Sequence, residues 1–156
     1  QNGDCRLALD LLLKAADIAE RNGEDRVREE HVLMAQREIE KNLAVDVIKS
    51  LPLHVKLVLT AIYVLERQKY RNLTTGTIYN KYVELTRVIG VDPVSQRRVS
   101  EILNELDMMG IINARVVSMG RYGRTKVITL SVPERSIREG LEEDLLLLGL
   151  AEVVAV

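Results

Sequence analysis

The spacing of apolar and polar positions predicts two helices in residues 1–50. Apolar side chains recur at helical spacing over residues 7–21, and Asn22-Gly23 follows with a glycine suited to a left-handed cap. A second helical pattern covers residues 28–48. Its apolar stripe consists of Val32, Leu33, Ala35, Ile39, Leu43 and Val47. Two helices joined by a short loop form an αα-hairpin, which is too small to be stable alone.

Three more helices are predicted from residue 52 onward. Ser50-Leu51-Pro52 interrupts the helical pattern, and Pro52 suits the first turn of a helix over residues 52–68. The next helix is expected over residues 76–89, with Thr74 or Thr75 as its cap and Gly90 at its end. The third is expected over residues 92–109. Its predicted signals are Asp92 as cap, Pro93 in the first turn, and the buried stripe Val99, Ile102, Leu103 and Leu106.

After Gly110 the spacing of apolar residues changes from the period of a helix to that of a strand. Residues 111–118 and 125–132 are β-branched runs on either side of a glycine-containing turn, which predicts a β-hairpin. A last helix is expected over residues 136–148. We therefore predict a mainly α protein with a small β-hairpin: an αα-hairpin (1–50), a winged helix-turn-helix domain (51–133) and a C-terminal helix that packs on it (134–156).

Composition narrows the class of protein. No apolar run is long enough to cross a bilayer, and no leader opens the chain, so we expect no membrane partner and a cytoplasmic location. The chain opens on Gln1 rather than Met, which suggests a fragment. Cys5 is the single cysteine, and His31 and His54 have no partner at ligand spacing. We expect both histidines to be ordinary surface or boundary residues, and we expect no metal site.

Charge is unevenly distributed along the chain. The chain as a whole has a net charge of −1, yet residues 52–132 carry 12 basic and 6 acidic side chains, which leaves +6. Both flanking segments are acidic. A basic segment between acidic ones is typical of a domain that meets a polyanion, so the winged helix is predicted to bind double-stranded DNA.

Polar residues lie where that binding requires them. The third helix of such a domain enters the major groove, and its N-terminal end meets the base edges. The expected contacts there are Ser95, Gln96, Arg97, Arg98, Ser100 and Glu101. The hairpin, or wing, is expected to follow the backbone or enter the minor groove. Its expected contacts are Gly120, Arg121, Tyr122, Gly123, Arg124 and Lys126. Weaker candidates for phosphate contacts are Lys56, Lys69, Arg71 and Lys81.

Two other functions are compatible with a winged helix. One is transcription regulation through the same DNA-binding surface, and the other is a protein-interaction module for helicase or initiator partners. Steep loss of affinity with salt would favour DNA over a protein partner. An enzyme is disfavoured, since no nucleophile–base pair or paired-carboxylate site emerges from the spacing.

Two stretches resemble a known family. Gly3-Asp4-Cys5-Arg6, followed by a leucine-rich helix, is similar to the lid segment of AAA+ replication initiators. The stretch from Gln96 to Leu106 and on through Gly110-Ile111-Ile112 resembles the recognition helix of archaeal origin-recognition proteins of the Orc/Cdc type. Thr75-Gly76-Thr77-Ile78-Tyr79 fits the same family.

The resemblance implies properties of a longer parent protein. That parent would bind ATP or ADP with Mg²⁺, recognise origin DNA, and cooperate with the replicative helicase and other initiator subunits at the nucleoid. Arg6 would match the sensor arginine that reaches the nucleotide from the lid. The 156 residues contain no Gly-x-x-x-x-Gly-Lys-Ser/Thr phosphate loop. We therefore expect no bound cofactor and no ATPase activity in this chain.

Overall fold

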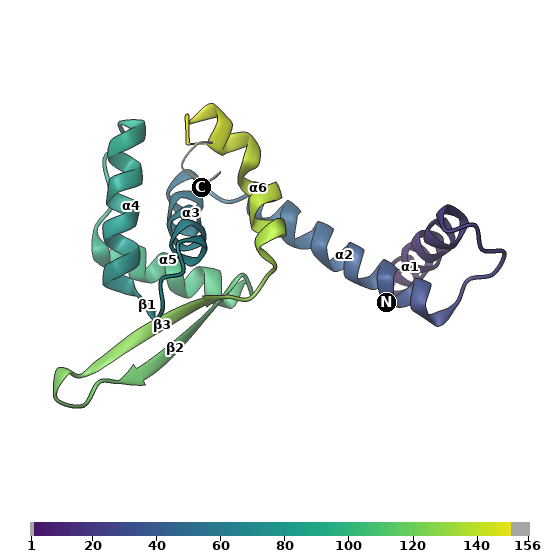
Figure 1. Ribbon diagram of the computed structural model, residues 1–156, viewed down its shortest axis with the longest axis horizontal. Coiled ribbons are helices and arrows are strands. Elements are labelled where there is room, and N and C mark those ends of the chain that lie inside the picture. Colours follow the sequence, from purple (N-terminus) through teal and green to yellow (C-terminus); the bar gives the residue numbers. More distant parts are fainter. Residues whose placement is uncertain (1, 151–156) are drawn as a thin grey trace. The chain divides into compact units, whose positions relative to one another are not determined.

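The computed structural model describes residues 2–150 of the chain (Figure 1). The chain forms two compact units, one up to Leu43 and one from Ala44 onward. None of the helices in the described part is both long and apolar enough to cross a bilayer. The elements are α1 (Asn2–Arg21), α2 (Glu29–Lys49), α3 (Leu53–Arg67), β1 (Leu73–Thr74), α4 (Thr75–Ile89), α5 (Gln96–Met108), β2 (Ile112–Ser118), the short 3-10 helix η1 (Gly120–Tyr122), β3 (Arg124–Leu130) and α6 (Glu134–Leu147).

The first unit is the predicted αα-hairpin, held by a small core. Ala15 and Ile18 of α1 are buried with Ala35 of α2, and Leu11 and Val32 pack against them. The expected stripe on α2 is wrong in part, because Leu33, Leu43 and Val47 are 41–57% exposed. Two helices without a third layer offer too little surface to cover every apolar side chain that they carry.

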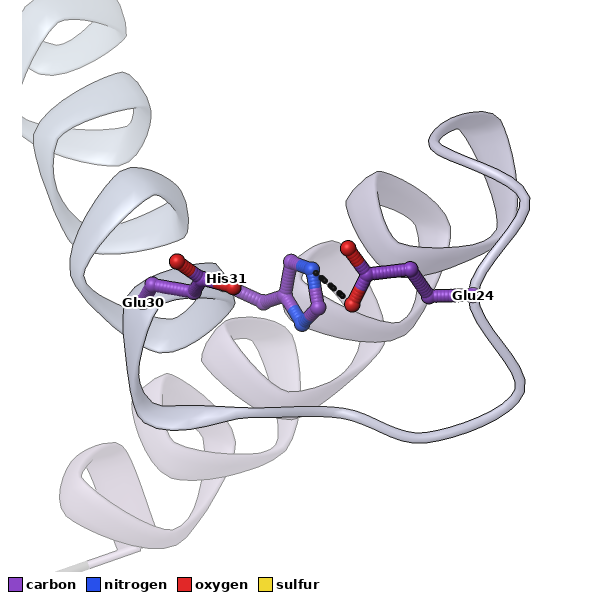
Figure 2. A group of neighbouring side chains, drawn as sticks. All are labelled: Glu24, Glu30 and His31. Carbon is purple, nitrogen blue, oxygen red and sulfur yellow. Dashed lines mark ion pairs between the residues drawn. The ribbon is translucent and has the colours of Figure 1, made fainter.

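His31 is buried in this hairpin, contrary to the surface or boundary position expected for it. Its ring is 1% exposed, and Nδ1 accepts a hydrogen bond of 2.8 Å from the backbone N–H of Arg28. Nε2 lies 3.1 Å from Oε2 of Glu24, as Figure 2 shows. The imidazole therefore ties the start of α2 to the loop that follows α1.

Glu24, Glu30 and His31 form a group whose possible metal-ligand atoms lie within 4.8 Å of one another (Figure 2). The hydrogen bond that Nδ1 accepts opposes the use of this ring as a metal ligand. Because Nδ1 accepts the N–H of Arg28, the proton of the neutral ring lies on Nε2, and no ring lone pair is left for a cation. The group is better explained as the closure of the hairpin loop.

The second unit has the predicted winged-helix architecture. Helices α3, α4 and α5 pack on one another, and α4 and α5 contact a three-stranded antiparallel sheet in the order β1-β3-β2. Strands β2 and β3 pair from Ile112↔Leu130 to Ser118↔Arg124 and extend past the helices as a ribbon (Figure 1). The predicted hairpin is thus joined by a third strand, β1, which pairs with β3 at Ile128 and Val127. Large buried side chains of the core include Tyr63, Tyr82, Ile102, Leu103, Leu106 and Ile111.

The residues that cap α4 at its two ends are among those that the sequence predicts. Oγ1 of Thr74 accepts a hydrogen bond from the backbone N–H of Thr77, so this threonine is the N-cap. At the other end Gly90 adopts a left-handed conformation with φ of 75°. A residue with a Cβ would be strained there, which explains the glycine.

Helix α5 begins later than the sequence predicts. It starts at Gln96, and Oγ of Ser95 caps it by accepting a 3.1 Å hydrogen bond from Arg98 N–H. Asp92 and Pro93 lie in the connection before it. The carbonyl of Val94, which would bond Arg98 N–H in a longer helix, instead accepts from the hydroxyl of Tyr79. A tertiary hydrogen bond therefore occupies the carbonyl that a longer helix would use.

Helix α6 packs on the core of the second unit. Nζ of Lys56 on α3 donates to Asp144, and Gly140 lies against Ile48. The compact units therefore divide within α2, earlier than the predicted boundary at residues 50–51, because Ile48 is buried with the second core. Residues 151–156, which the sequence analysis assigned to the C-terminal segment, lie outside the described residues.

The contact at Gly140 predicts a stability loss. A Cβ at this position would lie 2.5 Å from Cγ2 and 2.6 Å from Cβ of Ile48, so one of the two helices must shift. We expect Gly140→Ala to lower the free energy of unfolding by about 1–3 kcal/mol, the usual cost of overpacking. Urea unfolding followed by circular dichroism measures it. The exposed helical position Glu143→Ala is the control, and equal stability of Gly140→Ala and wild type would contradict the prediction.

Candidate nucleic-acid interface

One open hollow of about 590 Å³ lies where α4, α5 and β3 meet. It is lined by residues at the starts of α4 and α5 and by residues of the wing strand β3. The lining residues are Thr75, Gly76, Gln96, Arg97, Ser100, Arg124, Thr125 and Lys126. Gln96, Arg97, Ser100, Arg124 and Lys126 were predicted from the sequence as contacts, and the structure brings these five together.

The neighbouring arginines of α5 have different surroundings. Arg97 lines the hollow, and within residues 2–150 its side chain makes no hydrogen bond or ion pair. Arg98 instead lies 2.9 Å from Glu105 and 3.3 Å from Glu101, and it does not line the hollow. The hydrogen bond that Arg98 donates to Glu105 and the negative charge of Glu105 raise the pKa of the Arg98 guanidinium, and Glu101 contributes in the same two ways. Of the two arginines, Arg97 is the one whose guanidinium has no acidic partner among the described residues.

The other predicted contacts of α5 also divide into residues that line the hollow and residues that do not. Gln96 and Ser100 line the hollow together with Arg97. Glu101 is paired with Arg98 and is absent from the lining. The Ser95 hydroxyl oxygen is the cap of the helix, so its role in the structure is to fix where the free backbone amides begin.

Three lining residues, Thr75, Gly76 and Thr125, were missed by the sequence prediction. Thr75 and Gly76 form the first turn of α4, directly after the Thr74 cap. The first backbone N–H groups of a helix have no partner within it, and they carry the positive end of the helix dipole. Small residues at a capped helix start were the signal that could have identified this wall.

The wing tip is built on two glycines in left-handed or related conformations. Gly120 has φ of 62° and Gly123 has φ of 83°, and the N–H of Met119 donates to the carbonyl of Gly123 at 2.7 Å. This tight turn displays Arg121 and Tyr122, and the Tyr122 side chain is 91% exposed. The tip therefore presents a cation and an aromatic ring to solvent, beyond the hollow.

Hydrogen bonds hold the wing against the helices. Nζ of Lys126 donates to Oδ1 of Asn104 on α5 at 2.7 Å. Oε1 of Glu66 on α3 accepts from the backbone N–H of Leu130 at 3.1 Å, and Asp107 accepts from Ala114 N–H at 3.2 Å. Asn104 was not among the predicted contacts. These bonds keep the base of the wing at a fixed place beside α5.

The weaker candidates lie outside the hollow. Lys56 is only 13% exposed and is paired with Asp144, so the structure opposes a phosphate role for it. Lys81 pairs with Glu84 at 3.1 Å. Lys69 and Arg71 are exposed in the connection between α3 and β1. Arg6 is exposed on α1, and one arginine does not make a nucleotide site.

This arrangement defines a class of protein: a lid-type helical hairpin joined to a winged-helix domain with a basic, open surface. Residues 46–140 match the family model of the CDC6 C-terminal winged helix domain, and residues 1–37 match that of the Cdc6 AAA+ ATPase-type lid domain. The chain belongs to the Cdc6 winged-helix family.

Curated relatives and a solved structure support this membership. The chain is 50% identical over 142 residues to ORC1-type DNA replication protein 1 of Sulfurisphaera tokodaii, covering 91% of the chain and 36% of that relative. It is 50% identical over 144 residues to the ORC1-type DNA replication protein of Pyrococcus furiosus, covering 92% and 34%. A structure of the Aeropyrum pernix ORC1 protein in complex with DNA superposes with a TM-score of 0.81 at 48% identity, covering 92% of this chain and 37% of that one. The chain thus spans about a third of the length of these relatives.

Proposed function

We propose that this chain binds double-stranded origin DNA during initiation of replication. The observation that carries the proposal is that Arg97 on α5 and Arg124 on β3 line one hollow, and that neither side chain has a hydrogen-bond or ion-pair partner among residues 2–150. A similar protein, the Aeropyrum pernix ORC1 protein, has been solved with DNA, which supports the choice of ligand.

The shape of the hollow suggests how the duplex is held. The N-terminal turn of α5 enters the major groove, where Arg97 donates to base edges and Gln96 and Ser100 supply further polar contacts. The amides at the start of α4 take a backbone phosphate. The wing crosses the backbone, and Arg121 and Tyr122 at its tip reach the adjacent minor groove.

A longer parent would add functions that this chain cannot perform alone. We propose that the parent is an ATPase, which binds ATP or ADP with Mg²⁺ through residues outside this chain. The exposed Arg6 supplies at most one contact to that nucleotide. The same parent would meet other initiator subunits and the replicative helicase on origin DNA, and so act at the nucleoid.

The test is a binding titration against salt. A duplex carrying an archaeal origin repeat and the same duplex with its sequence scrambled are each titrated between about 50 and 200 mM KCl. We expect affinity for both to fall steeply with salt, because cations on the protein displace counterions from phosphates. We also expect tighter binding of the origin repeat at every salt concentration. Weak, salt-insensitive binding of both duplexes would overturn the proposal in favour of a protein-interaction module.

Lys126 offers a quantitative prediction within this titration. Its ammonium group lines the hollow while bonded to Asn104, and a lysine is suited to a phosphate rather than to one base. We expect Lys126→Ala to weaken binding to the origin and scrambled duplexes by about the same factor. The slope of log affinity against log salt should fall by about 1. Arg138→Ala on α6 is the control for a lost charge, and a change in sequence preference by Lys126→Ala would contradict the phosphate role.

A further inference from the structure

The hydroxyl of Tyr82 joins three parts of the winged helix. Tyr82 is on α4, and its side chain is fully buried. Its oxygen lies 2.8 Å from Nδ1 of His54 at the start of α3 and 2.9 Å from the backbone N of Val94. Val94 directly precedes Ser95, the cap of α5. One buried hydroxyl therefore connects α3, α4 and the residue before the recognition helix.

The backbone N–H of Val94 can only donate, so the Tyr82 oxygen accepts there. The Tyr82 O–H can donate to Nδ1 of His54 in the ring tautomer that carries its proton on Nε2. Burial raises the pKa of the Tyr82 phenol, which keeps the phenol proton in place. The Tyr79 hydroxyl donates to the carbonyl of Val94 at 3.3 Å. Two tyrosines of α4 thus occupy both polar backbone groups of Val94.

The sequence around Val94 contains two possible helix starts. Asp92 is a good cap residue and Pro93 suits a first turn, so the local sequence favours a helix from there. The structure uses Ser95 instead. A start at the earlier position would move the free amides of α5 by three residues, or about 4.5 Å along the helix axis. The shape of the hollow beside Gln96 would then change.

We infer that Tyr82, supported by His54, is a positioning residue for DNA recognition: it holds Val94 out of the helix and so selects Ser95 as the start of α5. This inference rests on the proposed function. The Tyr82 hydroxyl does not line the hollow, so it acts on DNA only through the place where Gln96 and Arg97 begin.

The first test is Tyr82→Phe, with Tyr63→Phe as its matched control. Tyr63 is also buried and also has a bonded hydroxyl, but its partner is Arg67 rather than the segment before α5. Affinities for the origin and scrambled duplexes are measured for both variants. We expect Tyr82→Phe to reduce the ratio of the two affinities about 3- to 10-fold, the scale of one net hydrogen bond. Tyr63→Phe should leave that ratio at the wild-type value. Equal ratios for the two variants would overturn the inference.

The second test needs no DNA and so separates this inference from the proposed function. Backbone NMR chemical shifts report whether residues 92–95 are helical. We expect them to move toward helical values in Tyr82→Phe and to stay extended in Tyr63→Phe. Unchanged shifts in Tyr82→Phe would overturn the inference even if DNA binding is intact. Conversely, a shifted helix start in a protein that binds no duplex would refute the proposed function alone.

His54 provides a rescue experiment. His54→Leu removes the acceptor for the Tyr82 O–H, whereas His54→Asn places an amide oxygen near the position of Nδ1. We expect His54→Leu to lower the affinity ratio in the same direction as Tyr82→Phe, and His54→Asn to restore most of the loss. If His54→Leu keeps the wild-type ratio, His54 has no part in positioning α5.

Discussion

Replacing Arg97 and Arg124 together by alanine is expected to weaken binding to the origin duplex about 30- to 1,000-fold. Both side chains line the hollow, one from α5 and one from β3. An arginine that donates two hydrogen bonds to a guanine contributes roughly 1–3 kcal/mol, and a lost phosphate contact adds to this. A combined loss of about 2–4 kcal/mol gives the stated range, since about 1.4 kcal/mol corresponds to a factor of ten. Fluorescence anisotropy at fixed salt measures it.

The matched control for this double variant removes the same charge elsewhere. Arg135 and Arg138 are exposed on α6 and do not line the hollow. Their double alanine variant changes the net charge equally, so any long-range electrostatic effect is shared. We expect it to bind DNA within a few-fold of wild type. Equal losses in the two double variants would mean that charge alone, rather than the position of Arg97 and Arg124, governs binding.

Replacing Leu103 by alanine is expected to cause a large loss of folding stability. Leu103 is fully buried on the inner side of α5, within the core that α3 and α4 share. Leucine-to-alanine changes at such sites cost about 2.7–5 kcal/mol, because transfer energy is lost and a cavity remains. Denaturant unfolding measures the change. Met108→Ala is the control on the same helix, since Met108 is 88% exposed. A loss below about 1 kcal/mol for Leu103→Ala would contradict the packing described.

Much of the fold follows from local signals in the sequence. The stripe Val99, Ile102, Leu103 and Leu106 is buried as its spacing predicts, and Thr74 and Gly90 cap α4 as their chemistry predicts. These features depend on residues close together in the chain, so local patterns are sufficient. Membership of the Cdc6 family was also predictable, because the lid and recognition-helix motifs lie in the chain itself.

The start of α5 could not be predicted in this way. Asp92 and Ser95 are both cap residues, and Pro93 makes the local chemistry favour Asp92, which is not the cap that the structure uses. The choice is made by Tyr79 and Tyr82, which lie more than ten residues earlier and bond both backbone groups of Val94. Tertiary hydrogen bonds of this kind leave no periodic signal in the sequence.

The sequence could not predict which of Arg97 and Arg98 pairs with an acidic residue. Glu101 is four residues after Arg97 and three after Arg98, so either arginine could pair with it on a helix. The structure pairs it with Arg98, whose guanidinium also reaches Glu105. The burial of His31 could not be predicted for a similar reason. Glu24, which lies beside its ring, is in a loop that has no periodic pattern in the sequence.

Mapping the DNA contact residue by residue tests most directly whether the hollow and the wing bind the duplex. Amide NMR spectra of the isotope-labelled chain are recorded while an origin-repeat duplex is added. We expect the largest shifts at the starts of α4 and α5 and along the wing, at residues 75–77, 96–100 and 120–126. Shifts concentrated on α6 or on the αα-hairpin, with these three segments unchanged, would contradict this expectation.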